Sequence, residues 1–131
     1  MLNAVNVFAM NNRVVYRNSE LNNRTVSVDA ISGSEFWSIE GSNVQFTWFN
    51  VPANKRFEKH SHDSEQITYV LEGELYFKSG NAAYKLSKGD CILIPAYTEH
   101  EVWTEKESAK AVDAWSPINE NFSRKSNLLN K

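Results

Sequence analysis

Short runs of hydrophobic and polar residues in alternation recur along most of this chain. The run VQFTWFNV at 44–51 is rich in β-branched and aromatic side chains, which pack well on a pleated sheet. Similar runs predict strands at 14–17, 25–30, 56–60, 66–71, 74–78, 83–86, 90–94, 99–104 and 108–114. Turn residues separate many of them, at 52–54, 72–73, 79–81 and 87–90. Many short strands with Gly or Pro turns predict an all-β sandwich or jelly roll.

Length and composition are those of one small globular domain covering residues 1–131. A net charge of −2 provides no basic surface, so neither nucleic acid nor an anionic membrane is an expected partner. The first residues lack the basic region of a signal peptide, and their apolar run is too short for a membrane span, which predicts a cytoplasmic protein. The single Cys91 excludes an internal disulfide. The polar tail at 118–131 is expected to be a short helix or a frayed end.

The three histidines of the chain lie in two short blocks. His60 and His62 form a His-x-His pair, Gln66 follows four residues later, and His100 lies downstream. Residues two apart on a strand point to the same face, so the paired imidazoles can converge on one point. Neutral imidazole is the commonest metal ligand, and a mixed nitrogen and oxygen set suits a borderline divalent cation. The alternative, two polar residues on a solvated strand, is less favoured because the surrounding spacing also fits a metal site.

The surrounding sequence resembles the two signature motifs of the cupin superfamily, over residues 54–104. The first motif is matched by Asn54, His60, His62, Gln66 and Gly73, and the second by Gly89, Pro95 and His100. Tyr97 and Thr104 replace the Gly and the Asn of the second motif. The resemblance implies a double-stranded β-helix, or jelly roll, whose strands bring His100 to His60, His62 and Gln66. It also implies one divalent transition metal ion, such as Ni, Zn, Fe or Mn, with positions open to water or substrate.

The departures from these motifs have physical consequences. Asn54 replaces a Gly, and Asn is the residue besides Gly that best tolerates a left-handed backbone. Tyr97 would be strained there, so either the turn differs locally or the tyrosine covers the site as a substrate-binding residue. Gln66 in place of Glu keeps an oxygen ligand but removes a negative charge. A site with neutral ligands favours an anionic, oxygen-rich substrate.

The segment at 113–117, DAWSP, is similar to a segment of the small pectin-degradation cupins, which linearise unsaturated uronic acids by opening the sugar ring. This resemblance implies that Asp113 and Trp115 are catalytic. Asn119 stands where that family has an Arg, which removes a two-pronged clamp for a carboxylate. Arg56, or the neighbouring Lys55, can serve instead. A strand-end Asp that hydrogen-bonds to a turn is the alternative reading of Asp113.

Three functions remain open. The first is a metal-dependent enzyme of carbohydrate metabolism that isomerises or opens an unsaturated uronate or keto-sugar, with Asp113 moving a proton. The second is an Fe- or Mn-dependent dioxygenase or decarboxylase. The third is a non-enzymatic protein that binds a sugar or another small ligand. A homodimer is also expected, formed through an N-terminal strand that carries Val5 and Val7.

Overall fold

The computed structural model describes residues 14–28 and 31–123, and nearly all of their regular structure is β-strand. A short helix, α2 (Asn18–Asn23), precedes the strands, and a 3₁₀ turn, η1 (Glu120–Phe122), follows them. The strands are β1 (Val26–Ser27), β2 (Glu35–Glu40), β3 (Gln45–Val51), β4 (Arg56–His60), β5 (Glu65–Ser79), β6 (Ala82–Ser87), β7 (Cys91–Ile94), β8 (His100–Trp103) and β9 (Ala109–Ser116). None of the helices in these described ranges is long and apolar enough to cross a membrane.

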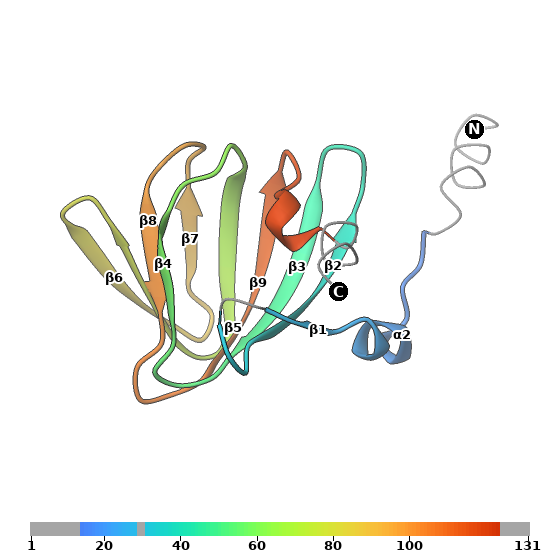
Figure 1. The fold of residues 1–131 in the computed structure, drawn as a ribbon, viewed down its shortest axis with the longest axis horizontal. Helices are drawn as coiled ribbons and strands as arrows, with labels where there is room; N and C mark the ends of the chain where they lie inside the picture. Colours follow the sequence, from blue (N-terminus) through green and yellow to red (C-terminus); the bar gives the residue numbers. More distant parts are fainter. Residues whose placement is uncertain (1–13, 29–30, 124–131) are drawn as a thin grey trace.

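The strands form two antiparallel layers that curl around a shared interior (Figure 1). In one layer β1, β2, β3, β9, β5 and β7 lie side by side in that order. In the other, β4 pairs with β8, β8 with β5, and β5 with β6. The fold is therefore an all-β double-stranded β-helix, or jelly roll, as the sequence predicts.

Strand β5 is long because it belongs to both layers. Its first half, from Glu65 to Gly73, pairs with β9, and its second half, from Glu74 to Ser79, pairs with β6. The register with β9 shifts between Val70 and Glu72, which is the mark of a bulge that bends a strand. Gly73 follows with a φ of +74°, a conformation that L side chains rarely adopt. The bend at this glycine carries the chain from one layer into the other.

Two apolar clusters fill the interior between the layers. One is built on Val70, Leu75 and Phe77 of β5 together with residues of β6, β7 and β9. The other contains Phe36, Phe49, Val51 and Trp115, with Phe57 and Phe122 packed against it. Every second residue of β9, from Ala109 to Trp115, is buried, as a strand with one face on a core requires.

Most strands predicted from the alternation are present, with ends that differ by a residue or two. Three differences stand out. Residues 14–17 form no strand, and α2 follows directly after them. Strand β2 was not predicted, although its sequence EFWSIE alternates between buried and partly buried positions. The predicted turn at 72–73 is instead the bend inside β5. Val5 and Val7, and most of the tail at 118–131, lie outside the described residues.

Candidate metal centre

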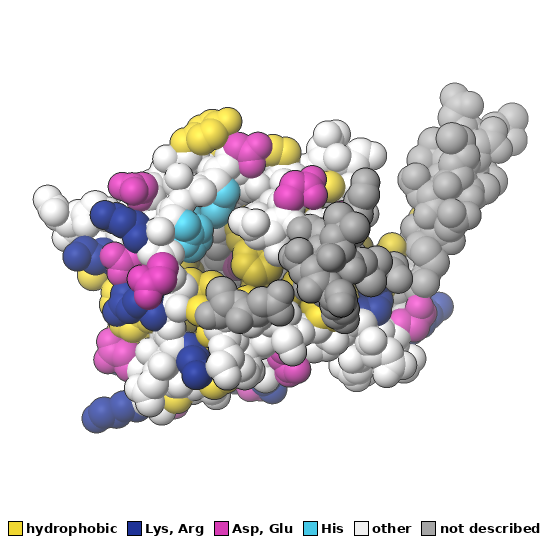
Figure 2. All heavy atoms as spheres, viewed as in Figure 1, with side chains coloured by type: hydrophobic (Ala, Val, Ile, Leu, Met, Phe, Trp, Pro, Cys, Tyr) yellow, Lys and Arg dark blue, Asp and Glu magenta, His cyan; other side chains and the backbone are white. Residues whose placement is uncertain are grey.

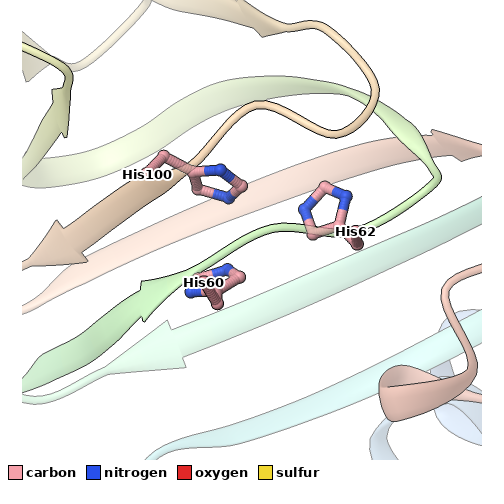
Figure 3. A group of neighbouring side chains, drawn as sticks. All are labelled: His60, His62 and His100. Atoms are coloured by element: carbon pink, nitrogen blue, oxygen red, sulfur yellow. The ribbon is translucent and has the colours of Figure 1, made fainter.

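Three histidines meet at one end of the interior. His60 is the last residue of β4, His62 lies just beyond it, and His100 begins β8 (Figure 3). His60 and His100 are direct partners in the β4–β8 ladder. The ring centroid of His100 lies 4.3 Å from that of His60 and 4.9 Å from that of His62. One ligand atom from each histidine lies within 4.8 Å of the other two. The structure thus brings together the three imidazoles that the sequence predicted as ligands.

Backbone carbonyl groups orient all three rings in the same way. The Nδ1 atoms of His60, His62 and His100 lie 2.6, 2.8 and 2.8 Å from the carbonyl oxygens of Glu58, Ser64 and Thr98. A carbonyl oxygen only accepts, so each Nδ1 carries the proton and donates it. In neutral imidazole the lone pair is then on Nε2. This is the second-sphere arrangement that fixes the tautomer and the direction of metal-binding histidines.

His100 is the most buried of the three histidines and is 2% exposed. Its Nε2 is buried and has no hydrogen-bond partner in the described structure. Burial lowers the pKa of His100 to about 4; the hydrogen bond to Thr98 opposes this effect, and the charges of His60 and His62 add to it. His100 is therefore neutral at physiological pH. A buried lone pair without a donor is the arrangement expected of a residue that binds a cation.

Gln66, on β5, places its amide oxygen 3.1 Å from Nε2 of His62. Its amide nitrogen donates to Oγ1 of Thr68 at 2.8 Å, which turns the oxygen toward the histidines. Two acceptors, the amide oxygen and the unprotonated Nε2, therefore face each other. A cation held between them removes this repulsion. The donor set of three imidazoles and one amide oxygen fits a divalent transition metal ion, the cofactor that the sequence predicts.

Asp113 lies on β9 directly opposite Thr68, and it is 6% exposed. The hydroxyl of Thr68 hydrogen-bonds to Oδ1 of Asp113. Burial raises the pKa of Asp113 to about 7, while hydrogen bonds from Thr68 and Gln66 act in the opposite direction. A carboxyl group with a pKa near neutrality can both take up and release a proton, as a general acid or base must.

A cavity of about 50 Å³ lies beside these polar groups. Most of its lining is apolar: Phe49, Val51, Phe57, Leu75, Phe77, Val102, Ala109, Ala111, Trp115 and Phe122. His60, Gln66, Thr68, His100 and Asp113 supply its polar lining, which includes no Lys or Arg. Figure 2 shows histidine side chains at the molecular surface next to hydrophobic ones. The cavity therefore has a polar end at the histidines and an apolar remainder.

Trp115 is a wall of this cavity. It is 3% exposed, its ring stacks on Phe122 with centroids 5.7 Å apart, and it meets His62 edge-on at 5.3 Å. Its Nε1 donates to Oγ1 of Thr47 at 3.0 Å. The indole is thus held in place from two sides, and it borders the cavity together with Asp113.

The structure does not bring the three predicted substrate-binding residues to the cavity lining. Arg56 pairs with Glu101 at 2.6 Å on the outside and lies over the Trp103 ring. Asn119 is buried, but its backbone bonds to the side chain of Gln45 and its side chain caps η1. Tyr97 has a φ of +61° and is 76% exposed, while its N–H donates to the carbonyl of His62 at 2.7 Å. Tyr97 thus supports the loop that carries His62.

Thr68 is the polar residue of the site that sequence reasoning missed. It lies two residues after Gln66 on a strand that was predicted, so alternation alone places both on the same face. A polar residue at an inward position of an otherwise apolar strand was the available signal. Its pairing with Asp113 joins residues 45 positions apart, which no local pattern reveals.

Comparison with known proteins gives consistent matches. A family model described as a cupin domain matches residues 47–115. Acireductone dioxygenases of Tuber melanosporum and Heterostelium pallidum are 36% and 37% identical over alignments of 75 residues. The matches cover 48% of this chain and 43% and 51% of those two proteins. The chain thus spans about half the length of these relatives. The solved structure of KdgF from Halomonas sp. superposes with a TM-score of 0.74 at 18% identity, covering 84% of this chain and all of that one.

Proposed function

Since the chain belongs to the cupin family, we propose that its histidine cluster holds one divalent transition metal ion through Nε2 of His60, His62 and His100 and the amide oxygen of Gln66. The observation that carries this proposal is the common orientation of the three rings. Each Nδ1 is engaged by a carbonyl, and each Nε2 is left to a ligand. The unpartnered, buried Nε2 of His100 supports it independently.

The chemistry that best fits this site is a proton transfer on a small, oxygen-rich substrate, such as the ring opening or isomerisation of a sugar. A bound divalent ion would polarise a carbonyl or hydroxyl oxygen of the substrate. Asp113, whose pKa is raised to about 7, takes up or releases the proton through its carboxyl group. Thr68 fixes the direction of that carboxyl, and Trp115 closes the cavity beside it.

The lining of the cavity limits the substrate class. The oxygen atoms of the substrate belong at the histidines and Asp113, and its carbon skeleton belongs against the apolar wall. No Lys or Arg is among the described lining residues, and Arg56 is engaged by Glu101 on the outside. Apart from the proposed metal ion, the cavity therefore offers no cation to pair with a carboxylate. We therefore place a neutral keto-sugar or hydroxyketone ahead of an unsaturated uronate.

A dioxygenase is the second candidate, and the sequence matches favour it. The curated relatives named above are acireductone dioxygenases, at 36% and 37% identity. The residues proposed as ligands lie within the region that the cupin-domain model matches. Consumption of O₂ separates the two candidates, since ring opening and isomerisation need none. Acireductone, a keto-sugar and an unsaturated uronate are the substrates to compare.

The metal assignment is tested by elemental analysis of untagged protein and by calorimetric titration of the metal-free protein with Ni²⁺, Zn²⁺, Fe²⁺ and Mn²⁺. His60→Ala and His100→Ala are expected to lose stoichiometric binding and keep a β-rich circular dichroism spectrum. Ser61→Ala is the matched control, because Ser61 is exposed and lies between two of the proposed ligands. Full metal occupancy in both histidine variants would refute the site.

The catalytic assignment is tested with Asp113→Asn in protein loaded with metal. The variant is expected to bind metal as the wild type does and to lose roughly a hundred- to ten-thousandfold in turnover. Unchanged turnover would exclude Asp113 as the acid or base. If the loaded wild type changes none of the three substrates, the enzymatic proposal fails, and the protein that binds a small ligand without transforming it becomes the better reading.

A further inference from the structure

Three polar side chains of β2 and β3 are buried in the interior although none of them lines the cavity. Ser38, Gln45 and Thr47 are 5%, 1% and 0% exposed. We name these three residues the polar cluster. Burying polar groups costs free energy unless they are hydrogen-bonded, whereas a fully bonded buried network makes the groups that it joins rigid. The partners of the polar cluster therefore indicate what it holds in place.

The polar cluster is a continuous chain of hydrogen bonds that ends on Trp115. Nε2 of Gln45 donates to Oγ of Ser38 at 3.1 Å, and Oγ of Ser38 lies 3.3 Å from Oγ1 of Thr47. Oγ1 of Thr47 accepts the indole N–H of Trp115 at 3.0 Å. A hydroxyl group has two lone pairs and one proton, so Thr47 accepts the indole proton and still bonds to Ser38. The position of a cavity wall thus depends on Thr47.

The other end of the polar cluster holds the segment that follows β9. Oε1 of Gln45 accepts the backbone N–H of Asn119 at 2.7 Å, and Nε2 of Gln45 donates to the carbonyl of Asn119 at 3.3 Å. Asn119 in turn caps η1, the turn that contains Phe122. Phe122 stacks on the ring of Trp115. The polar cluster therefore fixes the indole twice, through its N–H and through the ring that packs on its face.

His62 is the proposed histidine ligand with the least support from the sheet. His60 and His100 are partners in the β4–β8 ladder, whereas His62 lies beyond the end of β4 (Figure 3). Its ring packs on the indole of Trp115 in a T-shaped arrangement, with centroids 5.3 Å apart and an angle of 73° between the planes. Trp115 is also the direct ladder partner of Gln66, another proposed ligand. Movement of the indole therefore changes the packing of the His62 ring.

We propose that Thr47 is a positioning residue of the metal centre. Its hydroxyl holds the Trp115 indole in the place where the ring of His62 directs Nε2 at the metal ion. Ser38 and Gln45 fix the hydroxyl of Thr47 in turn. A threonine suits this role because its branched side chain has few rotamers, so the backbone of β3 sets the direction of the hydroxyl. This inference rests on the proposed metal site, and Thr47 acts on that site through Trp115.

The test is a titration of the metal-free protein with Co²⁺, whose visible absorption depends on the geometry of its ligands. Thr47→Val keeps the branched shape and removes the acceptor of the indole proton. We expect Thr47→Val to weaken Co²⁺ binding roughly tenfold, the lower end of the effect of losing an outer partner of a ligand, and to change the Co²⁺ spectrum. Thr47→Ser keeps a hydroxyl and should retain the wild-type affinity and spectrum.

Thr104→Val is the matched control for a purely structural effect. Thr104 is 3% exposed, and its hydroxyl bonds to the backbone of Pro52 and Lys55, outside the cavity lining. We expect Thr104→Val to lose stability and to keep the wild-type Co²⁺ affinity and spectrum. A folded Thr47→Val variant with wild-type affinity and spectrum would overturn the proposal. So would a Thr104→Val variant with the same losses as Thr47→Val.

Nuclear magnetic resonance of the metal-free protein gives a readout that needs no metal ion. In Thr47→Val the ring signals of His62 should shift and the indole N–H of Trp115 should exchange faster with solvent, whereas Thr104→Val should change neither. If the wild type binds no Co²⁺ but these changes occur, the metal site is wrong and the hold of Thr47 on the two rings is supported. If Thr47→Val does not fold, Ser38→Ala takes its place with smaller expected changes, and wild-type behaviour of that variant would overturn the proposal.

Discussion

Gly73 is the residue at which a single added methyl group should do most damage to the fold. It has a φ of +74° at the bend of β5, and it is paired with Ala109 of β9. A Cβ atom built there lies 1.9 Å from the carbonyl oxygen of Ser108 and 3.2 Å from the Cα of Ala109. Both obstacles are backbone atoms, so no rotation of a side chain relieves the overlap. Gly73→Ala must therefore push β5 and β9 apart.

The magnitude follows from two separate costs. A left-handed conformation costs an L residue about 1–2 kcal/mol. Forcing extra volume into a packed site costs about 1–3 kcal/mol more when the backbone has to shift. Gly73→Ala should therefore lower the free energy of unfolding by about 2–5 kcal/mol, a large part of the 5–15 kcal/mol typical of a domain. Gly80→Ala is the matched control, because Gly80 also has a positive φ, +59°, but nothing lies within 4 Å of its Cβ position.

The assay is urea unfolding of both variants, with the free energies extrapolated linearly to water. Changes in the unfolded chain are the same for the two Gly→Ala substitutions and cancel in the comparison. The difference between the variants thus measures the clash with the backbone of Ser108 and Ala109, and we expect about 1–3 kcal/mol. Equal stabilities of Gly73→Ala and Gly80→Ala would show that β5 and β9 are not held as closely as the structure indicates.

Three further outcomes are expected. Thr68→Val should weaken metal binding measured by titration calorimetry, because the amide nitrogen of Gln66 loses the hydroxyl acceptor that turns the amide oxygen inward. Thr68→Ser keeps a hydroxyl and should retain the wild-type affinity. Equal metal affinities of Thr68→Val and the wild type would refute the orienting role. In metal-free protein, the pKa of His100 is lowered from 6.5 to about 4, so this residue makes the folded state less stable as the pH falls below 6.5. The pKa of Asp113 is raised from 3.8 to about 7, so this residue makes the folded state less stable as the pH rises toward 7. Asp113→Asn should therefore lose stability more steeply than the wild type when urea unfolding is repeated from pH 7 to pH 4, and parallel curves would contradict these assignments. Arg56→Ala should change stability by no more than about 1 kcal/mol and leave turnover unaltered, since its ion pair is exposed; a loss of activity would return Arg56 to the substrate site.

The sequence predicted the parts of this molecule that depend on local patterns. Alternation located most strands, and the turn chemistry of Asn54 was confirmed by its φ of +59°. Residues 14–17 were wrongly predicted as a strand. They are partly hydrophobic, but they pair with no strand in the described structure. Strand β2 escaped notice because its pairing with β3, and not its own composition, defines it.

For the candidate site, the sequence predicted the proposed metal ligands but not the groups that orient them. The histidines and Gln66 were predicted from spacing. The carbonyl partners that orient them, the link from Thr68 to Asp113 and the position of Arg56 outside the cavity depend on three-dimensional arrangement. Tyr97 shows the same limit: its positive φ was foreseen as a strain, but its hydrogen bond to the His62 carbonyl was not.

The continuity of β5 through both layers also limits how the molecule can move. Enzymes that open by a hinge separate two bodies joined by a few pliable residues. Here the joining element is one strand with cross-strand partners along both of its halves, so a hinge between the layers would have to break its ladders with β9, β6 or β8. Entry and exit of a small molecule therefore depend on local motion around the exposed His60 and the loop of His62, while the two layers keep their positions relative to each other.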